Sequence, residues 1–227
     1  MIEVNKISFS YGKSLVLKDI SFQLEDGKIY GLLGENGVGK TTLLTLLSGL
    51  KICQEGTINV DGFKPFDRKP SFLSNQYFLS DDVAPVNMSA IAFAKNYGKF
   101  WVNFSLDKFK EIMQLFDYDL NQNMSKMSAG QLKKSYIAFA LACNCKYLYM
   151  DEPTNGLDIP SKALFRKALL QYVSEDSTVL ISTHQVRDLE NVIDPIIILD
   201  NKDVLLNATV DEISQKLYFD YSNTLKD

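Results

Sequence analysis

The sequence has no long hydrophobic run and no excess of basic residues. Its longest apolar stretches, 136–143 and 196–199, fall far short of the roughly 18 to 20 residues that a membrane-spanning helix needs. The net charge of -4 gives no positive field to hold a nucleic-acid backbone, so nucleic-acid binding is not expected. Segment 1–13 lacks the basic start and apolar stretch of a secretory signal, which indicates a cytoplasmic protein.

Cysteine and histidine are also scarce. The three cysteines, Cys53, Cys143 and Cys145, are an odd number and predict no disulfide framework in a reducing compartment. The close pair Cys143 and Cys145 raises the possibility of a metal site, but a single histidine and no second cysteine pair favour buried apolar residues instead. Neither glycine nor proline is in excess, so the 227 residues suit one soluble globular domain.

Short apolar segments bounded by turn residues alternate with helical patterns over most of the chain. Strands are expected at 2–9, 15–24, 28–33, 56–60, 147–150, 178–182 and 196–199, and helices at 41–50, 161–173 and 186–192. This alternation predicts an α/β fold with a mainly parallel sheet covered on both faces, preceded by an antiparallel β subdomain at the N-terminus.

The texture changes between residues 76 and 127, where strand patterns vanish. Helical periodicity appears at 88–97 and 106–116, joined by Asn-rich connections. We therefore expect an α-helical subdomain, approximately 76–140, inserted into a single domain that spans 1–227 and has a short C-terminal tail at 205–227.

A glycine-rich segment lies between an apolar strand and a helix and matches the P-loop pattern G-x-x-x-x-G-K-[ST]. Its residues are Gly34, Glu35, Asn36, Gly37, Val38, Gly39, Lys40 and Thr41, followed by Thr42. Glycines allow the backbone N–H groups to surround a phosphate, and the helix N-terminus adds partial positive charge. Lys40 is expected to reach the β and γ phosphates and Thr41 to hold Mg²⁺. The alternative is a glycine turn that only caps the helix.

Two adjacent acids, Asp151 and Glu152, follow the apolar strand 147–150. In a parallel sheet beside the glycine-rich loop, Asp151 would face the Mg²⁺ site and Glu152 would reach the attacking water. Strand ends are often acidic, so the pair alone is weak; together with the loop it favours catalysis over a purely structural role.

Segment 128–131 precedes another expected helix, which runs to about residue 142. Ser128 and Gln131 fit the S-x-x-Q pattern of a helix capping box, which is a sufficient structural explanation. With Ala129 and Gly130 between them, the same helix end is also a potential second anion site.

In order and spacing, these motifs resemble the nucleotide-binding domain of an ABC transporter, from Tyr11 to about Val204. The family signature is usually LSGGQ; the matching stretch here reads MSAGQ and departs at Met127 and Ala129. Gly130 is kept, whereas Ala129 tolerates a positive φ less readily than glycine does.

The resemblance implies further site residues. Tyr11 matches the aromatic residue that stacks on adenine, although it also suits a plain turn. Gln76 resembles the glutamine that contacts Mg²⁺ and the attacking water. Asp158, in the segment 155–158, matches an acid that reaches the opposing subunit, or alternatively caps the next helix. His184 matches the histidine that contacts the γ phosphate.

For function, the resemblance implies an ATP-hydrolysing subunit that uses ATP and Mg²⁺ and sits on the inner face of the cell membrane. It would pair head to tail with a second copy or a homologous subunit, each ATP lying between the P-loop of one and the segment contributed in trans by the other, and would drive a separate transmembrane permease. The in-trans residues are Ser128, Ala129, Gly130, Gln131 and Asp158.

Several alternatives remain open at this stage. Export is slightly favoured over import, because the helical lobe is compact and no regulatory domain is appended after about residue 211. A soluble, non-transport ABC-type ATPase and an ATP sensor that does not hydrolyse are the competing functions. Aromatic residues of the helical lobe would contact the permease or form the lobe's own core: Tyr77, Phe78, Phe93, Tyr97, Phe100 and Trp101.

Overall fold

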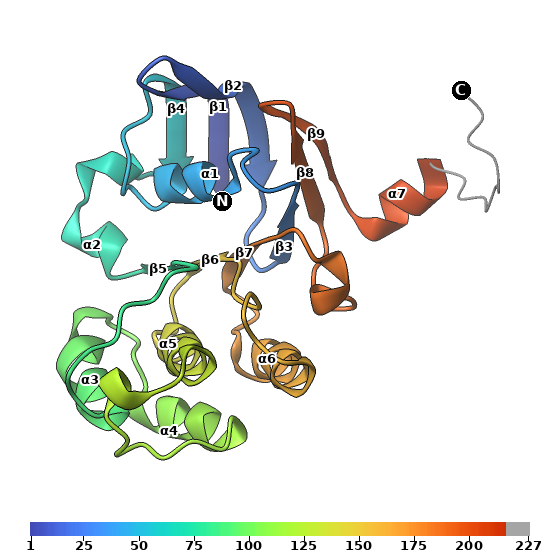
Figure 1. Cartoon of the computed structure of the whole chain (residues 1–227). Coiled ribbons are helices and arrows are strands. Elements are labelled where there is room, and N and C mark those ends of the chain that lie inside the picture. Colours follow the sequence, from blue (N-terminus) through green and yellow to red (C-terminus); the bar gives the residue numbers. More distant parts are fainter. Residues whose placement is uncertain (217–227) are drawn as a thin grey trace.

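Two sheets form the framework of the protein, described here for residues 1–216 of a computed structural model (Figure 1). Residues 217–227, part of the expected C-terminal tail, lie outside the described residues. The first sheet is antiparallel, in the order β2-β1-β4, and consists of β1 (Ile2–Tyr11), β2 (Ser14–Leu24) and β4 (Glu55–Val60). This is the N-terminal antiparallel subdomain that the sequence predicts.

The second sheet has the order β5-β6-β7-β3-β8-β9, and all its neighbours are parallel except β8 and β9. Its strands are β3 (Ile29–Leu33), β5 (Gln76–Leu79), β6 (Tyr147–Asp151), β7 (Thr178–Thr183), β8 (Ile196–Asp200) and β9 (Asp203–Ala208). A mainly parallel sheet in an α/β fold is therefore confirmed.

Helices cover this second sheet on both faces (Figure 1). One face packs on α1, which lies between the two sheets, and the other packs on the helical lobe and α6. The α-helices are α1 (Lys40–Leu47), α2 (Pro70–Leu73), α3 (Ala90–Tyr97), α4 (Leu106–Leu115), α5 (Ala129–Ala142), α6 (Ile159–Tyr172) and α7 (Val210–Lys216). None of the described helices combines the length and apolarity needed to cross a membrane.

Strand β6 shows how one short sequence serves both faces. Successive side chains of a strand point to opposite sides. Tyr147 and Tyr149 accordingly pack in the core around α1, whereas Leu148 and Met150 pack in the core with α5 and α6. All four are nearly inaccessible to water, which explains why this strand reads as a continuous apolar run rather than an alternating one.

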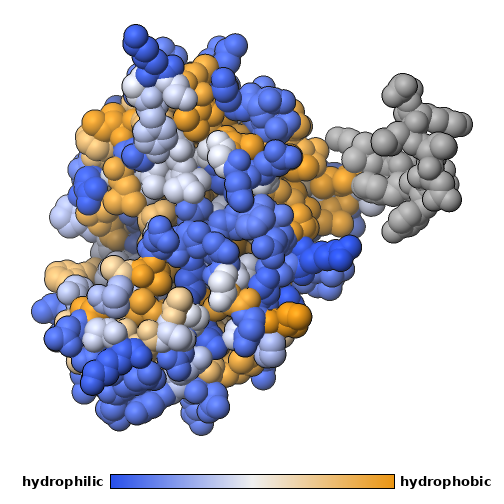
Figure 2. Space-filling model, in the orientation of Figure 1, coloured by the Kyte–Doolittle hydropathy of each residue, from blue (hydrophilic) through white to orange (hydrophobic). Residues whose placement is uncertain are grey.

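The aromatic residues of the helical lobe mainly form its own core. The Phe139 ring of α5 lies within 5.7 Å of the rings of Tyr77, Phe93 and Trp101, measured between centroids. Tyr97 and Phe100 remain exposed, at 41% and 62%. Figure 2 shows that apolar residues are interspersed with hydrophilic ones on the visible face.

Three segments differ from the sequence-based expectation. Residues 76–79 form β5, although strand patterns were expected to vanish there; with only four residues, β5 is too short to show a period. The helix expected at 186–192 is a single 3-10 turn, η4 (Val186–Leu189). Strand β9 and helix α7 were expected to be tail, yet β9 pairs with β8 along the edge of the sheet.

Candidate functional site

A cleft of about 550 Å³ opens where the carboxyl ends of neighbouring parallel strands meet the first turn of α1. Ligands of open α/β sheets bind at this edge, because loops that leave parallel strands converge there. The cleft is lined by Tyr11, Val16, Asn36, Gly37, Gly39, Lys40, Thr41, Thr42, Ser80, Asp81, Asp82, Asp151 and Glu152.

The glycine-rich loop that leaves β3 is shaped by close backbone approaches. A Cβ on Gly34 would lie 2.4 Å from the carbonyl oxygen of Leu199, so the loop passes β8 too closely for any side chain. Gly39, just before α1, has φ 113° and would place a Cβ 2.8 Å from the Leu17 side chain on β2. Both glycines are therefore required by the packing of the loop between the two sheets.

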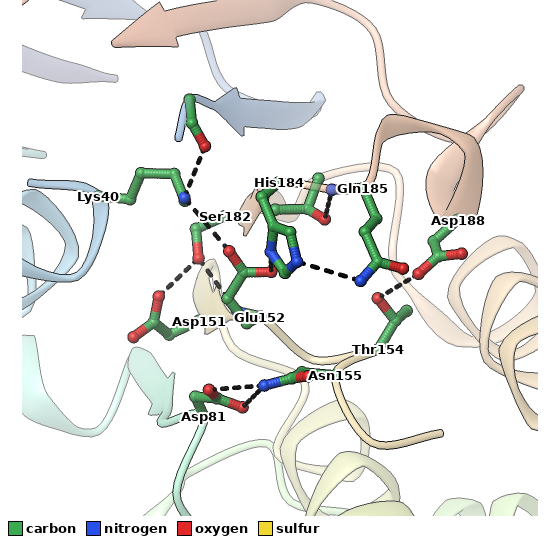
Figure 3. Close-up of polar contacts among 12 residues, drawn as sticks. Lys40, Asp81, Asp151, Glu152, Thr154, Asn155, Ser182, His184, Gln185 and Asp188 are labelled. Carbon is green, nitrogen blue, oxygen red and sulfur yellow. Dashed lines mark hydrogen bonds and ion pairs between the residues drawn. The ribbon is translucent and has the colours of Figure 1, made fainter. Parts of the chain in front are cut away.

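The Lys40 side chain is held inside this loop. Its ammonium donates hydrogen bonds to the carbonyl oxygens of Gly34 (2.8 Å) and Glu35 (3.0 Å). It also lies 3.3 Å from Oε1 of Glu152 (Figure 3). Only 5% of Lys40 is exposed. A buried ammonium at the start of a helix, fixed by backbone carbonyls, is a preformed site for an anion such as a phosphate.

Asp151, at the end of β6, is hydrogen-bonded to the first turn of α1 and to the neighbouring strand β7. Thr41 donates a hydrogen bond of 2.7 Å to its Oδ2, and Ser182 donates one of 2.6 Å to its Oδ1. A hydroxyl and a carboxylate in contact form a hard-oxygen donor set of the kind that Mg²⁺ prefers beside phosphates. The residues present therefore fit the predicted metal, and Thr41 and Asp151 are the side chains that could hold it.

Glu152 has a left-handed backbone with φ 44°, held by hydrogen bonds from its N–H to the hydroxyl and the carbonyl of Ser182. Such conformations in non-glycine residues are uncommon and cluster at functional sites. Its Oε2 lies 3.0 Å from Nδ1 of His184, while its buried Oε1 faces Lys40 and accepts no hydrogen bond from the described residues. The carboxylate thus lies in the cleft, and its Oε1 atom is available to accept a hydrogen bond.

His184 itself is the first residue after β7. Its second ring nitrogen, Nε2, lies 3.1 Å from Nε2 of Gln185 (Figure 3). The imidazole therefore bridges Glu152 and Gln185, and its contact with the γ phosphate stays a prediction.

Tyr11 stands at the rim of the same cleft. Its ring is 48% exposed and is fixed edge-on by Phe9, with centroids 5.0 Å apart, and by the Lys51 ammonium 4.8 Å from its centroid. Its hydroxyl lies 3.3 Å from Oγ1 of Thr42. An exposed, fixed aromatic ring at a cleft rim suits stacking by a planar base.

The structure contradicts the prediction that Gln76 contacts Mg²⁺ and the attacking water. Gln76 begins β5 and pairs with Tyr147, four residues before Asp151, so it lies about 13 Å, along the strand direction, from the edge of the sheet where the cleft opens. Its side-chain amide donates to the Ser48 carbonyl, and its backbone carbonyl accepts from Trp101. The residues that β5 delivers to the cleft are those after its carboxyl end, beginning with Ser80.

The residues expected to act in trans lie outside this cleft and bond to their own helices. Ser128 and Gln131 form the predicted capping box at the start of α5. Asp158 accepts a hydrogen bond of 2.9 Å from the Ser161 N–H and caps α6; its hydrogen bonds with Ser161 lower the pKa of Asp158. These contacts account for the capping roles, and the in-trans roles stay predictions.

Sequence reasoning missed several residues at this edge. Ser182 supports Asp151 and Glu152, Gln185 contacts His184, and Ser80 and Asp81 line the cleft. All of them lie at or just beyond the carboxyl end of a strand. The rule that located Asp151 would have located them too, had β5 been recognised.

Comparison with known proteins places this geometry among relatives. The family model described as ABC transporter matches residues 17–155. The chain is 30% identical to the zinc uptake system ATP-binding protein ZurA of Listeria innocua, over 96% of this chain and 89% of that protein. It is 29% identical to an uncharacterized ABC transporter ATP-binding protein of Methanocaldococcus jannaschii, over 97% and 82% of the two chains.

A solved structure, described as the ATP binding subunit of an ABC transporter, has the same fold. It superposes with a TM-score of 0.82 at 23% identity and covers 95% of this chain and 92% of its own.

Proposed function

The chain belongs to the ABC transporter family and is an ATP-binding ATPase subunit, and from this premise we propose that it powers transport through a separate transmembrane subunit. One observation carries the catalytic part of the proposal. Three charged groups, Lys40 at the start of α1 and the adjacent Asp151 and Glu152 at the end of β6, converge on the cleft that the P-loop lines. Phosphoryl transfer to water requires a group that binds the phosphates, a ligand for Mg²⁺ and a base that orients the attacking water, and these three residues are of the types required.

Each need is met by a specific group. Lys40 binds the β and γ phosphates, for which its ammonium is already held at the loop. Thr41 and Asp151 hold Mg²⁺, which when bound neutralises phosphate charge. Glu152 orients the attacking water and accepts its proton, and His184 fixes the Glu152 carboxylate and contacts the γ phosphate.

Binding of ATP brings about a rearrangement that we propose from the contacts around Lys40. The ammonium forms its ion pair with Glu152 across the position where a γ phosphate would approach. A phosphate competes for Lys40 with two or more charges against one, so it separates the pair. Glu152 is then released from Lys40 and remains beside His184, where water enters.

The second half of the site is supplied by a partner subunit in this proposal. Ser128, Ala129, Gly130 and Gln131, together with Asp158, lie at the exposed starts of α5 and α6, where helix N-termini present backbone N–H groups. A second copy or a homologous subunit, arranged head to tail, would place these groups against the γ phosphate of ATP in the first.

The transported substrate and direction belong to the transmembrane partner. Relatives include a zinc uptake system, a manganese transport system of Listeria innocua and an ATP-dependent lipid A-core flippase of Haemophilus influenzae, so both directions occur among them. We propose that the subunit acts at the inner face of the membrane. Reconstitution with the copurified partner in vesicles, with ATP supplied on one side, measures direction directly.

The test of the catalytic proposal is Glu152→Gln, which keeps the shape of the side chain and removes its basicity. We expect ATP binding to persist and hydrolysis to fall by about 100-fold or more, because general base catalysis typically contributes 10²- to 10⁴-fold. The blocked protein should accumulate as an ATP-dependent dimer in size-exclusion chromatography. Glu111→Gln, on the exposed side of α4, is the matched control and should behave as wild type. Normal turnover of Glu152→Gln would refute the role of Glu152.

A further inference from the structure

A second cleft, of about 400 Å³, lies beside the phosphate cleft and shares a wall with it. Both clefts are lined by Asp81 and Asp82, in the loop that follows β5. The second cleft is completed by residues at the start of α5, including Ala129 and Lys133, and by Asn155. Asp81 therefore lies between the catalytic edge and the helix end that carries the MSAGQ segment.

Lys133, in the second turn of α5, is buried against this wall. Its side chain is 5% exposed, and its ammonium bonds to Oδ1 of Asp81 at 3.0 Å and donates to the backbone carbonyl of Asp81 at 2.6 Å. One turn later, Tyr136 donates a hydrogen bond of 2.8 Å to the carbonyl of Ala84. Helix α5 thus forms hydrogen bonds with the loop after β5 from two successive turns.

The other oxygen of the Asp81 carboxylate contacts Asn155, in the turn that follows β6. The side-chain amide of Asn155 donates to Oδ2 of Asp81 at 3.0 Å and lies 3.3 Å from Oδ1 (Figure 3). The backbone N–H of Asn155 donates to the carbonyl of Glu152 at 3.1 Å, closing the turn after β6. A continuous series of polar contacts therefore joins Glu152 to α5 through Asn155, Asp81 and Lys133.

The position of this ion pair distinguishes it from an ordinary surface pair. In the Lys110–Asp107 pair on α4 the two side chains are 44% and 84% exposed, so water competes for both charges. The Lys133 ammonium has lost its water, and a lysine is rarely buried unless it is paired. The buried Lys133 ammonium consequently depends on that one carboxylate and on the carbonyl beside it.

We propose that Asp81 and Lys133 are positioning residues: their ion pair sets the orientation of the first turn of α5, and with it Ser128–Gln131, relative to Glu152. The proposal rests on the function proposed above, in which that turn meets the ATP of a partner subunit. Asp81 also lines the phosphate cleft, so the ion pair joins the walls of the two clefts.

The experiment uses the full chain with Lys133→Met, Asp81→Ala and the double variant. In Lys133→Met, methionine fills the buried space of the lysine stem, and Asp81, with its side chain 37% exposed, keeps Asn155 as a partner, so folding should survive. In Asp81→Ala, the Lys133 ammonium keeps its hydrogen bond to the backbone carbonyl of residue 81. We expect each single variant to lower kcat by about tenfold or more, with ATP affinity of the dilute monomer within about threefold, since small misplacements of reacting groups are costly. ATP-driven dimerisation in the Glu152→Gln background should weaken in parallel.

Two further comparisons separate positioning from a general structural role. The double variant should be no slower than the single variants, because coupled residues are non-additive, and Lys133→Arg should restore most of the rate. Lys110→Met and Asp107→Ala remove the exposed control pair and should leave kcat unchanged.

Equal kcat in Lys133→Met and wild type would overturn the inference, as would a loss of rate accompanied by an equal loss of monomer ATP affinity. Failure of the wild-type protein to hydrolyse ATP would instead refute the proposed function, independently of the ion pair.

Discussion

The catalytic edge of the parallel sheet and the exposed starts of α5 and α6 use polar groups in opposite ways. At the edge, Lys40, Asp151 and Glu152 are each at most 9% exposed, and groups from different strands contact one another. At the helix starts, Ser128 and Asp158 are exposed and bond to backbone N–H groups of their own helices. The edge is a cleft whose polar groups are joined by hydrogen bonds and an ion pair, whereas the helix starts are exposed. The proposed head-to-tail dimer would bring these two surfaces together.

The largest effect is expected at the edge, from Lys40→Met. The substitution removes the only positively charged side chain of the P-loop while keeping the apolar stem buried. We expect ATP hydrolysis to fall by about 100-fold or more, since loss of one preorganised electrostatic contact typically costs 10² to 10³ in rate. Equilibrium binding of ATP, measured with wild type in parallel, should weaken as well. Binding of unchanged affinity would show that Lys40 does not hold the phosphates.

The next effect is expected at the helix start, from Gly130→Ala. A Cβ on Gly130 would meet only the Gly156 carbonyl within 4 Å, at 3.8 Å, so the chain itself has room for it. In the dimer the added methyl group would keep a phosphate from the backbone, and we expect kcat to fall by about 10- to 100-fold. Stability should be equal or higher, because alanine suits a helix better than glycine does.

For Gly130→Ala, the fall in kcat and the unchanged or higher stability are tested together by measuring kcat and thermal unfolding on the same protein. A stable Gly130→Ala protein with full activity would mean that this helix start is only capped and meets no nucleotide, and the comparison between the two surfaces would fail. Ala129→Gly, which restores the commoner family residue at the neighbouring position, is a useful companion variant.

A smaller effect is expected from Gln76→Met, at the opposite end of β5 from the cleft. The variant loses one hydrogen bond to the Ser48 carbonyl, worth about 0.5–1.5 kcal/mol, and also removes the buried Oε1 atom that has no partner in the described structure. The two changes oppose each other, so the free energy of unfolding should change little. We expect kcat within about twofold of wild type; a large drop in kcat without a change in stability would restore the original prediction.

The smallest effect is expected from the cap of α6. Because its bonds with Ser161 lower the pKa of Asp158, this group stabilises the fold above its ordinary pKa of 3.8, and the contribution is lost as pH falls through the lower, folded-state pKa. Asp158→Ala should therefore be slightly less stable than wild type in urea unfolding near neutral pH, and the difference should shrink in acid. Asp158→Asn caps without charge and should show no such pH dependence. A constant difference at all pH values would contradict this account.

The parts of the site that were predictable from the sequence depend on local geometry. A glycine-rich loop before a helix and two acids after an apolar strand are each recognisable from a few consecutive residues. The structure brings Lys40, Thr41, Asp151 and Glu152 together. The same holds for the cap at Ser128, whose bonds span a single turn.

The failures come from tertiary context. Gln76 carried a suitable side chain, but its function depends on which end of β5 it occupies, and a four-residue strand gives no period from which to locate that end. Strand β9 exists because the edge of β8 accepts it. The role of Asp81 depends on its contact with the buried ammonium of Lys133, 52 positions later, and no local pattern in the sequence indicates this contact.

His184 bridges Glu152 and Gln185 and is the only histidine in the chain. Isotope labelling of histidine therefore yields a single imidazole spin system in an NMR spectrum, and that signal comes from the catalytic edge alone. Its ring-nitrogen shifts distinguish the two neutral tautomers and the cation. The protein thus carries its own spectroscopic label, able to follow the Glu152 carboxylate through nucleotide binding and through the dimerisation proposed above, without any added probe.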